Sequence, residues 1–299
     1  MNIARHWICC LAALPFALHA QTPPPLPHGA PIDLTTLDRD MAGPRAQVLV
    51  LGTSHLSHMP KDFDPKSLDG LMTRLTAFQP EIITIEQEPS DECDMAARQA
   101  AKYGADFCEP VDAARRATGL DIPDSLSEID QTLKAWPARP TPAQRRHLAA
   151  LFLASNDRAS AYTQWLQLPE AERHAGDGVD TALLQQFGKL AVTRDETLLI
   201  AARLAARLGL PRLYAVDNHS GDHTDVPDIK AFVRVLEADW KAGGAALDAQ
   251  EKALGPLEHG ADLLPLYRAL NDPARLAVRA DGNVRSAMRS TSPQHYSQM

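Results

Sequence analysis

Three short apolar runs, each ended by polar side chains, predict the strands of a sheet. The runs are residues 47–51, 81–85 and 212–216. A continuous apolar run of this length is typical of a strand that is buried on both faces, as in parallel sheets. A helical pattern at residues 67–78, ended by Pro80, separates the first two runs. This strand–helix–strand succession predicts a βαβ unit with parallel strands.

Longer patterns with helical spacing fill most of the remaining chain. Thr141 followed by Pro142 is typical of a helix start, and Thr193 with Glu196 has the spacing of a capping box for a helix ending near Gly209. The helix that starts at Thr141 and Pro142 continues through residues 147–153. Further helices are expected at residues 159–168 and 179–187, from Ile229 onward, and twice more before Asn271. The sequence therefore predicts an α/β fold: a short, mostly parallel sheet, helices on both faces, and a helical middle segment at residues 110–190.

The two ends of the chain differ from this pattern. Residues 1–20 have a short polar start, an apolar stretch and a small residue at Ala20, as in a secretory signal peptide. Residues 21–44 are rich in proline and predict an extended tether. Residues 279–299 are polar and without pattern, which predicts an irregular tail. We expect one domain at residues 45–278 and a periplasmic or secreted protein.

Composition and charge narrow the class of protein. Hydrophobic residues make up 44% of the 299 positions and charged residues 23%, which is ordinary for a globular protein. The net charge of -8 argues against a nucleic-acid partner. No second long apolar segment occurs, so we expect no membrane span after signal cleavage.

Two of the four cysteines remain after the expected cleavage, Cys93 and Cys108. An oxidising compartment favours a disulfide between them, with two buried free thiols as the alternative.

Chemistry-bearing side chains follow each of the three expected strands. His55 follows the first, Glu86 the second, and Asp217 and His219 the third. Because parallel strands end at the same edge of a sheet, we expect these side chains to converge there. Imidazole and carboxylate groups can hold a divalent metal ion, which would activate water for hydrolysis. Ordinary alternatives are solvated strand ends, hydrogen-bonding histidines and an Asx-turn at Asp217.

Other catalytic arrangements have less support from the sequence. It contains no GxSxG nucleophile elbow, HExxH helix, phosphate loop or dinucleotide fingerprint.

The run Leu49-Val50-Leu51-Gly52-Thr53-Ser54-His55, followed by Ile85-Glu86, resembles the opening of the TraB/GumN/TIKI-like superfamily, whose signature begins with GxxH after the first strand. The loop Asp217-Asn218-His219 is similar to an Asp-Asp-His-like loop in a bacterial branch of exported members. The resemblance implies an α/β fold with the site at strand ends and metal-dependent hydrolysis of peptides. We expect a peptide or small-molecule substrate. His55 would be a ligand or base, Glu86 a ligand or base, and Asp217 and His219 further ligands.

The final part of the family pattern, an Arg-Asn helix and a second Gly-x-x-His, is not recognised in this chain. This departure favours an alternative: a non-catalytic periplasmic binding or interaction protein on a hydrolase-like scaffold.

Overall fold

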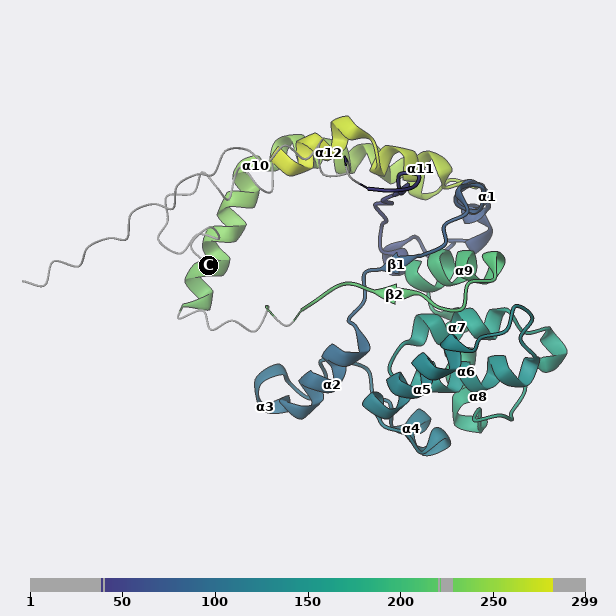
Figure 1. Cartoon of the computed structure of the whole chain (residues 1–299). Coiled ribbons are helices and arrows are strands. Elements are labelled where there is room, and N and C mark those ends of the chain that lie inside the picture. The colour runs from purple at the N-terminus through teal and green to yellow at the C-terminus, as the bar shows by residue number, and fades with distance from the viewer. Residues whose placement is uncertain (1–38, 40, 220, 222–227, 282–299) are drawn as a thin grey trace, which may run out of the picture. The chain divides into compact units, whose positions relative to one another are not determined.

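A computed structural model describes residues 39, 41–219, 221 and 228–281 (Figure 1). The expected signal peptide, residues 21–38 and 40 of the tether, and residues 282–299 of the tail lie outside the described residues. The chain divides into two compact units, residues 1–50 and 51–299. The described part of the first unit forms no helix or strand. All elements below belong to the second.

Helices dominate the second unit, together with one small parallel sheet (Figure 1). The elements before the middle of the chain are η2 (Leu56–His58), η3 (Pro65–Leu68), α1 (Asp69–Phe78), β1 (Thr84–Ile85), α2 (Ser90–Arg98), α3 (Ala100–Tyr103), α4 (Asp112–Thr118) and α5 (Ile122–Lys134). They are followed by α6 (Pro142–Ala154), α7 (Arg158–Leu166), η4 (Glu170–Glu172), α8 (Thr181–Val192), the π-helical η5 (Thr197–Ala202) and α9 (Arg203–Leu208). The last are β2 (Tyr214–Ala215), α10 (Ile229–Glu258), α11 (Leu264–Leu270) and α12 (Pro273–Ala280).

Two of the three expected strands form, and they pair in parallel as predicted. Thr84 lies opposite Tyr214, and Ile85 lies opposite Ala215. Backbone hydrogen bonds continue past the strand ends, where Asp217 N–H donates to the carbonyl of Gln87 at 3.2 Å. The helices from α2 to α9 lie between the two strands in sequence, so the expected helical middle segment is confirmed.

The expected strand at residues 47–51 is not formed, and this prediction was wrong. Val48 and Val50 are 81% and 85% exposed, and within the described residues no backbone hydrogen bond joins this run to a neighbour. An apolar run becomes a strand only where a second backbone accepts its hydrogen bonds. The sheet therefore has two short strands, and the first expected βαβ unit is absent from the described residues.

Most helix starts follow their sequence signals, with one correction. Thr141 and Gln144 form the reciprocal capping box that opens α6. The expected box at Thr193 is wrong, because Thr193 instead ends α8. Asp195 caps the following helix by accepting from Thr197 and Leu198 N–H. Glu196 is thereby left to bond elsewhere.

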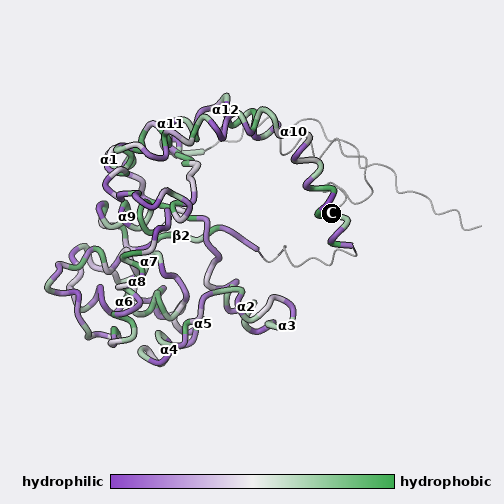
Figure 2. The backbone as a smooth tube through the Cα atoms, turned by 180° about the vertical axis from the view of Figure 1, so that it is seen from behind, coloured by the Kyte–Doolittle hydropathy of each residue, from purple (hydrophilic) through white to green (hydrophobic). Residues whose placement is uncertain are grey.

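The helix expected from Ile229 is confirmed and is longer than predicted. Hydrophobic and hydrophilic residues alternate along α10 (Figure 2), which runs to Glu258 and takes up sequence expected to form another helix. Only α11 follows it before Asn271 among the described residues, and α12 comes after. Residues 279 and 280 of the expected irregular tail belong to the end of α12.

Two clusters of buried apolar side chains form the interior of this unit. The first core joins β1 with helices α4 to α8, and the second joins η2, α1, α11 and the end of α10. The continuous helix formed by η5 and α9 contributes to both: Leu198 and Ala202 to the first, Leu199 and Leu204 to the second. The start of this helix is therefore fixed from two sides.

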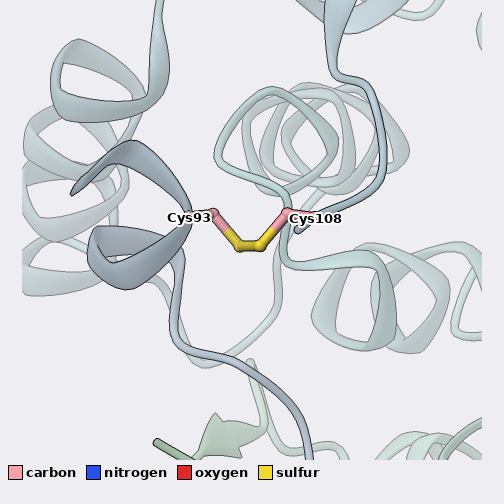
Figure 3. The surroundings of a disulfide bond; sticks show 2 residues. All are labelled: Cys93 and Cys108. Atoms are coloured by element: carbon pink, nitrogen blue, oxygen red, sulfur yellow. A yellow bond between two sulfur atoms is a disulfide. The ribbon is translucent and has the colours of Figure 1, made fainter. Parts of the chain in front are cut away.

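A disulfide joins Cys93 in α2 to Cys108 in the loop before α4, with 5.7 Å between the two Cα atoms (Figure 3). The expected pairing is confirmed. No helix in the described residues combines the length and the apolar composition needed to cross a membrane.

Candidate functional site

His55 is held by a carboxylate that the sequence did not suggest as its partner. Its Nδ1 lies 2.8 Å from Glu196 Oε1, across 141 residues of sequence. Because an ionised carboxylate can only accept, the proton of this bond belongs on Nδ1. The other ring nitrogen, Nε2, is then the one with a free lone pair. The His55 side chain is 66% exposed and that of Glu196 only 19%, so a solvent-accessible imidazole rests on a largely buried carboxylate.

The local fold fixes Glu196 tightly. Its second oxygen accepts from the backbone N–H of Leu56 at 3.1 Å, so one carboxylate binds both His55 and the next residue. Glu196 directly precedes the π-helical turn of η5, a type of distortion that is frequent at functional sites.

Asn271, just after α11, fixes the segment that leads to His55. Its Oδ1 accepts from Gly52 N–H at 2.6 Å and its Nδ2 donates to the Gly52 carbonyl at 2.9 Å. A Cβ at position 52 would lie 3.1 Å from Asn271 Oδ1, so a glycine suits this close approach. The Gly-x-x-His run is thus held at both ends, by Asn271 at the glycine and by Glu196 at the histidine.

Two hydroxyl groups near these residues in the chain are buried without a hydrogen-bond partner in the described structure. They are Ser54 Oγ, next to His55 in sequence, and the hydroxyl of Tyr267 in α11. Burial, with a smaller contribution from the negative charge of Glu196, raises the pKa of Tyr267 well above its ordinary value. The Tyr267 hydroxyl therefore stays protonated and is a buried donor.

Glu86 and Asp217 lie at the same edge of the sheet, as expected for parallel strands. Asp217 bonds to the backbone of Gln87, the residue after Glu86. Glu86 is exposed and lines a cavity of about 580 Å³ beyond the end of β1. His55 and Glu196 are not among the residues lining this cavity, although Asp195 and Thr197 on either side of Glu196 are. The structure thus places His55 with Glu196, and it places Glu86 in a cavity that is also lined by the two sequence neighbours of Glu196.

Asp217 and His219 bond to each other, with 2.8 Å between Asp217 Oδ2 and His219 Nε2. Within the described residues, no group of three or more His, Cys, Asp or Glu side chains has the geometry to hold a metal ion. The four expected ligands therefore lie in two separate groups. His55 pairs with Glu196, whereas Glu86, Asp217 and His219 lie at the strand edge. The described residues therefore do not form a site that fits the expected ion.

No family model, no curated protein and no solved structure matches this chain. The resemblance to the TraB/GumN/TIKI-like superfamily stays a prediction based on its motifs.

Sequence reasoning missed Glu196 and Asn271. Glu196 was interpreted as part of a capping box, and Asn271 only as a helix boundary. Neither has a local signal for its role, because both act on partners far away in sequence. One sequence feature could have pointed to Glu196. Asp195 already caps the helix, so the carboxylate of Glu196 is not needed for capping and can bind a distant partner.

Proposed function

We propose that this chain is an exported hydrolase in which His55, oriented by Glu196, activates water to cleave a peptide or ester bond in a small substrate. The observation that carries the proposal is the 2.8 Å contact between His55 Nδ1 and Glu196 Oε1. A carboxylate on one imidazole nitrogen fixes the ring and its tautomer and leaves the other nitrogen as a base.

The chemistry needs only the pair and a water molecule. His55 Nε2 takes a proton from water while the water oxygen attacks the substrate carbonyl carbon, forming a tetrahedral intermediate. The imidazolium gives that proton to the leaving amine or alcohol as the C–N or C–O bond breaks. Glu196 stabilises the imidazolium through the Nδ1 hydrogen bond. The exposure of His55 allows a substrate to reach Nε2.

The periplasmic or secreted location is part of this proposal, and the divalent ion expected from the sequence is an alternative to the metal-free mechanism. The Cys93–Cys108 disulfide supports an oxidising compartment. His55, Glu86, Asp217 and His219 remain the candidate ligands from the sequence.

The test is hydrolysis by the purified full chain of p-nitrophenyl acetate and of a mixture of short peptides followed by mass spectrometry. His55→Ala should lower the rate by at least about a hundredfold, the usual contribution of a general base. His259→Ala is the matched control, because His259 is exposed and makes no hydrogen bond to a carboxylate in the described structure. Equal rates for the two variants, or no hydrolysis by the unmodified chain, would overturn the proposal.

Parallel reactions in a chelator decide the role of metal. Full activity in the chelator supports the metal-free mechanism, whereas activity lost and then restored by one divalent ion assigns the ion to the reaction.

A binding protein without catalysis is the second candidate, and the cavity beyond β1 favours it. Its volume of about 580 Å³ is within the ordinary range for small-molecule sites. Ligand binding by a chain that hydrolyses nothing would support this candidate.

A further inference from the structure

The cavity beyond β1 is strongly acidic. It lies where the strand ends, a common place for ligands in α/β proteins. Five carboxyl groups line it: Glu86, Glu88, Asp106, Glu109 and Asp195. The one cationic side chain in the lining is Arg158, which is paired with Glu109 at 3.4 Å. The lining therefore has a large excess of negative charge.

A buried amide gives this cavity a polar group with no partner of its own. Asn156 lines the cavity and is only 6% exposed. Its backbone N–H donates to the Leu153 carbonyl, but within the described part of the chain its carboxamide makes no hydrogen bond. Its φ of 66° is a left-handed conformation that few residues other than Gly and Asn adopt readily. The residue as a whole is buried, but its carboxamide is not among the described side-chain groups that lack both solvent contact and a partner, so it can bond to a ligand in the cavity.

The rest of the lining is apolar. Phe107, Pro110, Leu190 and Leu198 contribute hydrophobic surface, and the Cys93–Cys108 disulfide forms part of the wall. A metal ion would make no use of such a surface, because hard divalent cations prefer a shell of oxygen ligands. A cationic group on a hydrocarbon chain fits both the charge and the apolar surface.

From these observations we infer that the cavity binds a protonated alkyl amine, with carboxylates around the ammonium group, the hydrocarbon chain against the apolar wall, and Asn156 bonded to a polar group of the ligand. The lysine side chain of a peptide and a free polyamine share this chemistry. The inference does not depend on hydrolysis by His55.

Calorimetric titration of the oxidised full chain tests the inference with three probes. The probes are N-acetyl-Ala-Lys-Ala-amide, the same peptide with norleucine in place of lysine, and spermidine. The lysine peptide should bind at least about tenfold more tightly than the norleucine peptide, and the difference should shrink as salt is added. Preference between the lysine peptide and spermidine identifies the source of the amine.

Variants assign the binding to this cavity. Asp106→Asn and Glu88→Gln should each weaken binding of the preferred amine by about threefold to tenfold. Asp130→Asn is the matched control, since Asp130 is an exposed carboxylate of α5 outside the lining. Asn156→Gly keeps the left-handed backbone available and removes the carboxamide, so it should weaken binding while thermal unfolding stays cooperative.

Any of the following results with the amine probes would overturn the inference. They are equal affinity for the lysine and norleucine peptides, no heat with either amine, and an equal effect of Asp130→Asn and Asp106→Asn. Binding of Ca²⁺ or Mg²⁺ by a chain with no affinity for amines would also overturn it, in favour of an inorganic-cation site. Because every readout is binding, failure of the proposed hydrolysis leaves this test intact.

Discussion

Asn271 forms two hydrogen bonds with the backbone of Gly52, 219 residues earlier in the chain. The pair joins the end of α11 to the segment that leads to His55.

The Asn271→Ala variant should lose both bonds, at a cost of about 1–3 kcal/mol in the free energy of unfolding. Asn271→Asp retains the acceptor for Gly52 N–H and loses the donor, so its loss should be smaller in chemical denaturation. Hydrogen exchange at residues 52–56 should rise in the alanine variant. An unchanged unfolding midpoint and unchanged exchange would show that the contact does not hold this segment.

The Cys93–Cys108 disulfide closes a loop with a sequence separation of 15 residues. Replacing both cysteines by alanine should lower the free energy of unfolding by about 3 kcal/mol, because the unfolded chain gains conformational freedom. Since both cysteines line the acidic cavity, amine affinity should fall as well. Denaturation and amine titration of the double variant measure the two effects. Stability and affinity equal to those of the oxidised chain would contradict this role.

The buried Arg146 predicts a pH dependence of stability. Its guanidinium binds Glu172 Oε2 and Asp177 Oδ2, each at 2.8 Å. The hydrogen bond from Arg146 holds the pKa of Glu172 below its ordinary value of 4.5. A depressed carboxyl pKa stabilises the folded state above the unfolded pKa, and this contribution is lost as the pH falls through the folded value.

Glu172→Gln should therefore lower the melting temperature near pH 7, with a difference from the unmodified chain that shrinks below pH 4.5. Glu170→Gln, an exposed neighbour with no ion pair among the described residues, is the control. A difference that stays constant with pH would contradict the assignment.

The buried hydroxyl of Tyr267 predicts that a core substitution at this position does not lower the stability of the fold. It has no hydrogen-bond partner in the described structure, and an unpaired buried polar group costs about 1–3 kcal/mol. Tyr267→Phe removes the hydroxyl and keeps the ring, so chemical denaturation should show equal or higher stability. A loss of more than about 1 kcal/mol would mean that the hydroxyl is bound in solution.

The sequence predicted those helices and helix starts that local patterns of apolar and capping residues determine. The helix at Pro142 and the amphipathic start of α10 follow from caps and periodicity. The parallel direction of the pairing between the segments at Ile85 and Ala215 agrees with the helices that lie between them in sequence. The strand at residues 47–51 failed because a run of apolar residues does not say whether a partner backbone lies beside it.

Only those site residues that have a local sequence signal could be predicted. His55 was predicted because it ends a Gly-x-x-His run after the expected strand at residues 47–51, which does not form, and Glu86 because it follows a strand that does form. Glu196 and Asn271 act through contacts across 141 and 219 residues of sequence, and no local pattern encodes such contacts. Tertiary packing decided which carboxylate reached His55.

The most direct measurement is the tautomer of His55, read from the ¹⁵N shifts of the imidazole ring in the full chain labelled at histidine. At a pH where the ring is neutral, the proton should be on Nδ1 and the lone pair on Nε2, and Glu196→Ala should abolish this preference. A proton on Nε2 of His55, or a tautomer unaffected by Glu196→Ala, would contradict the proposal that this pair is a poised base.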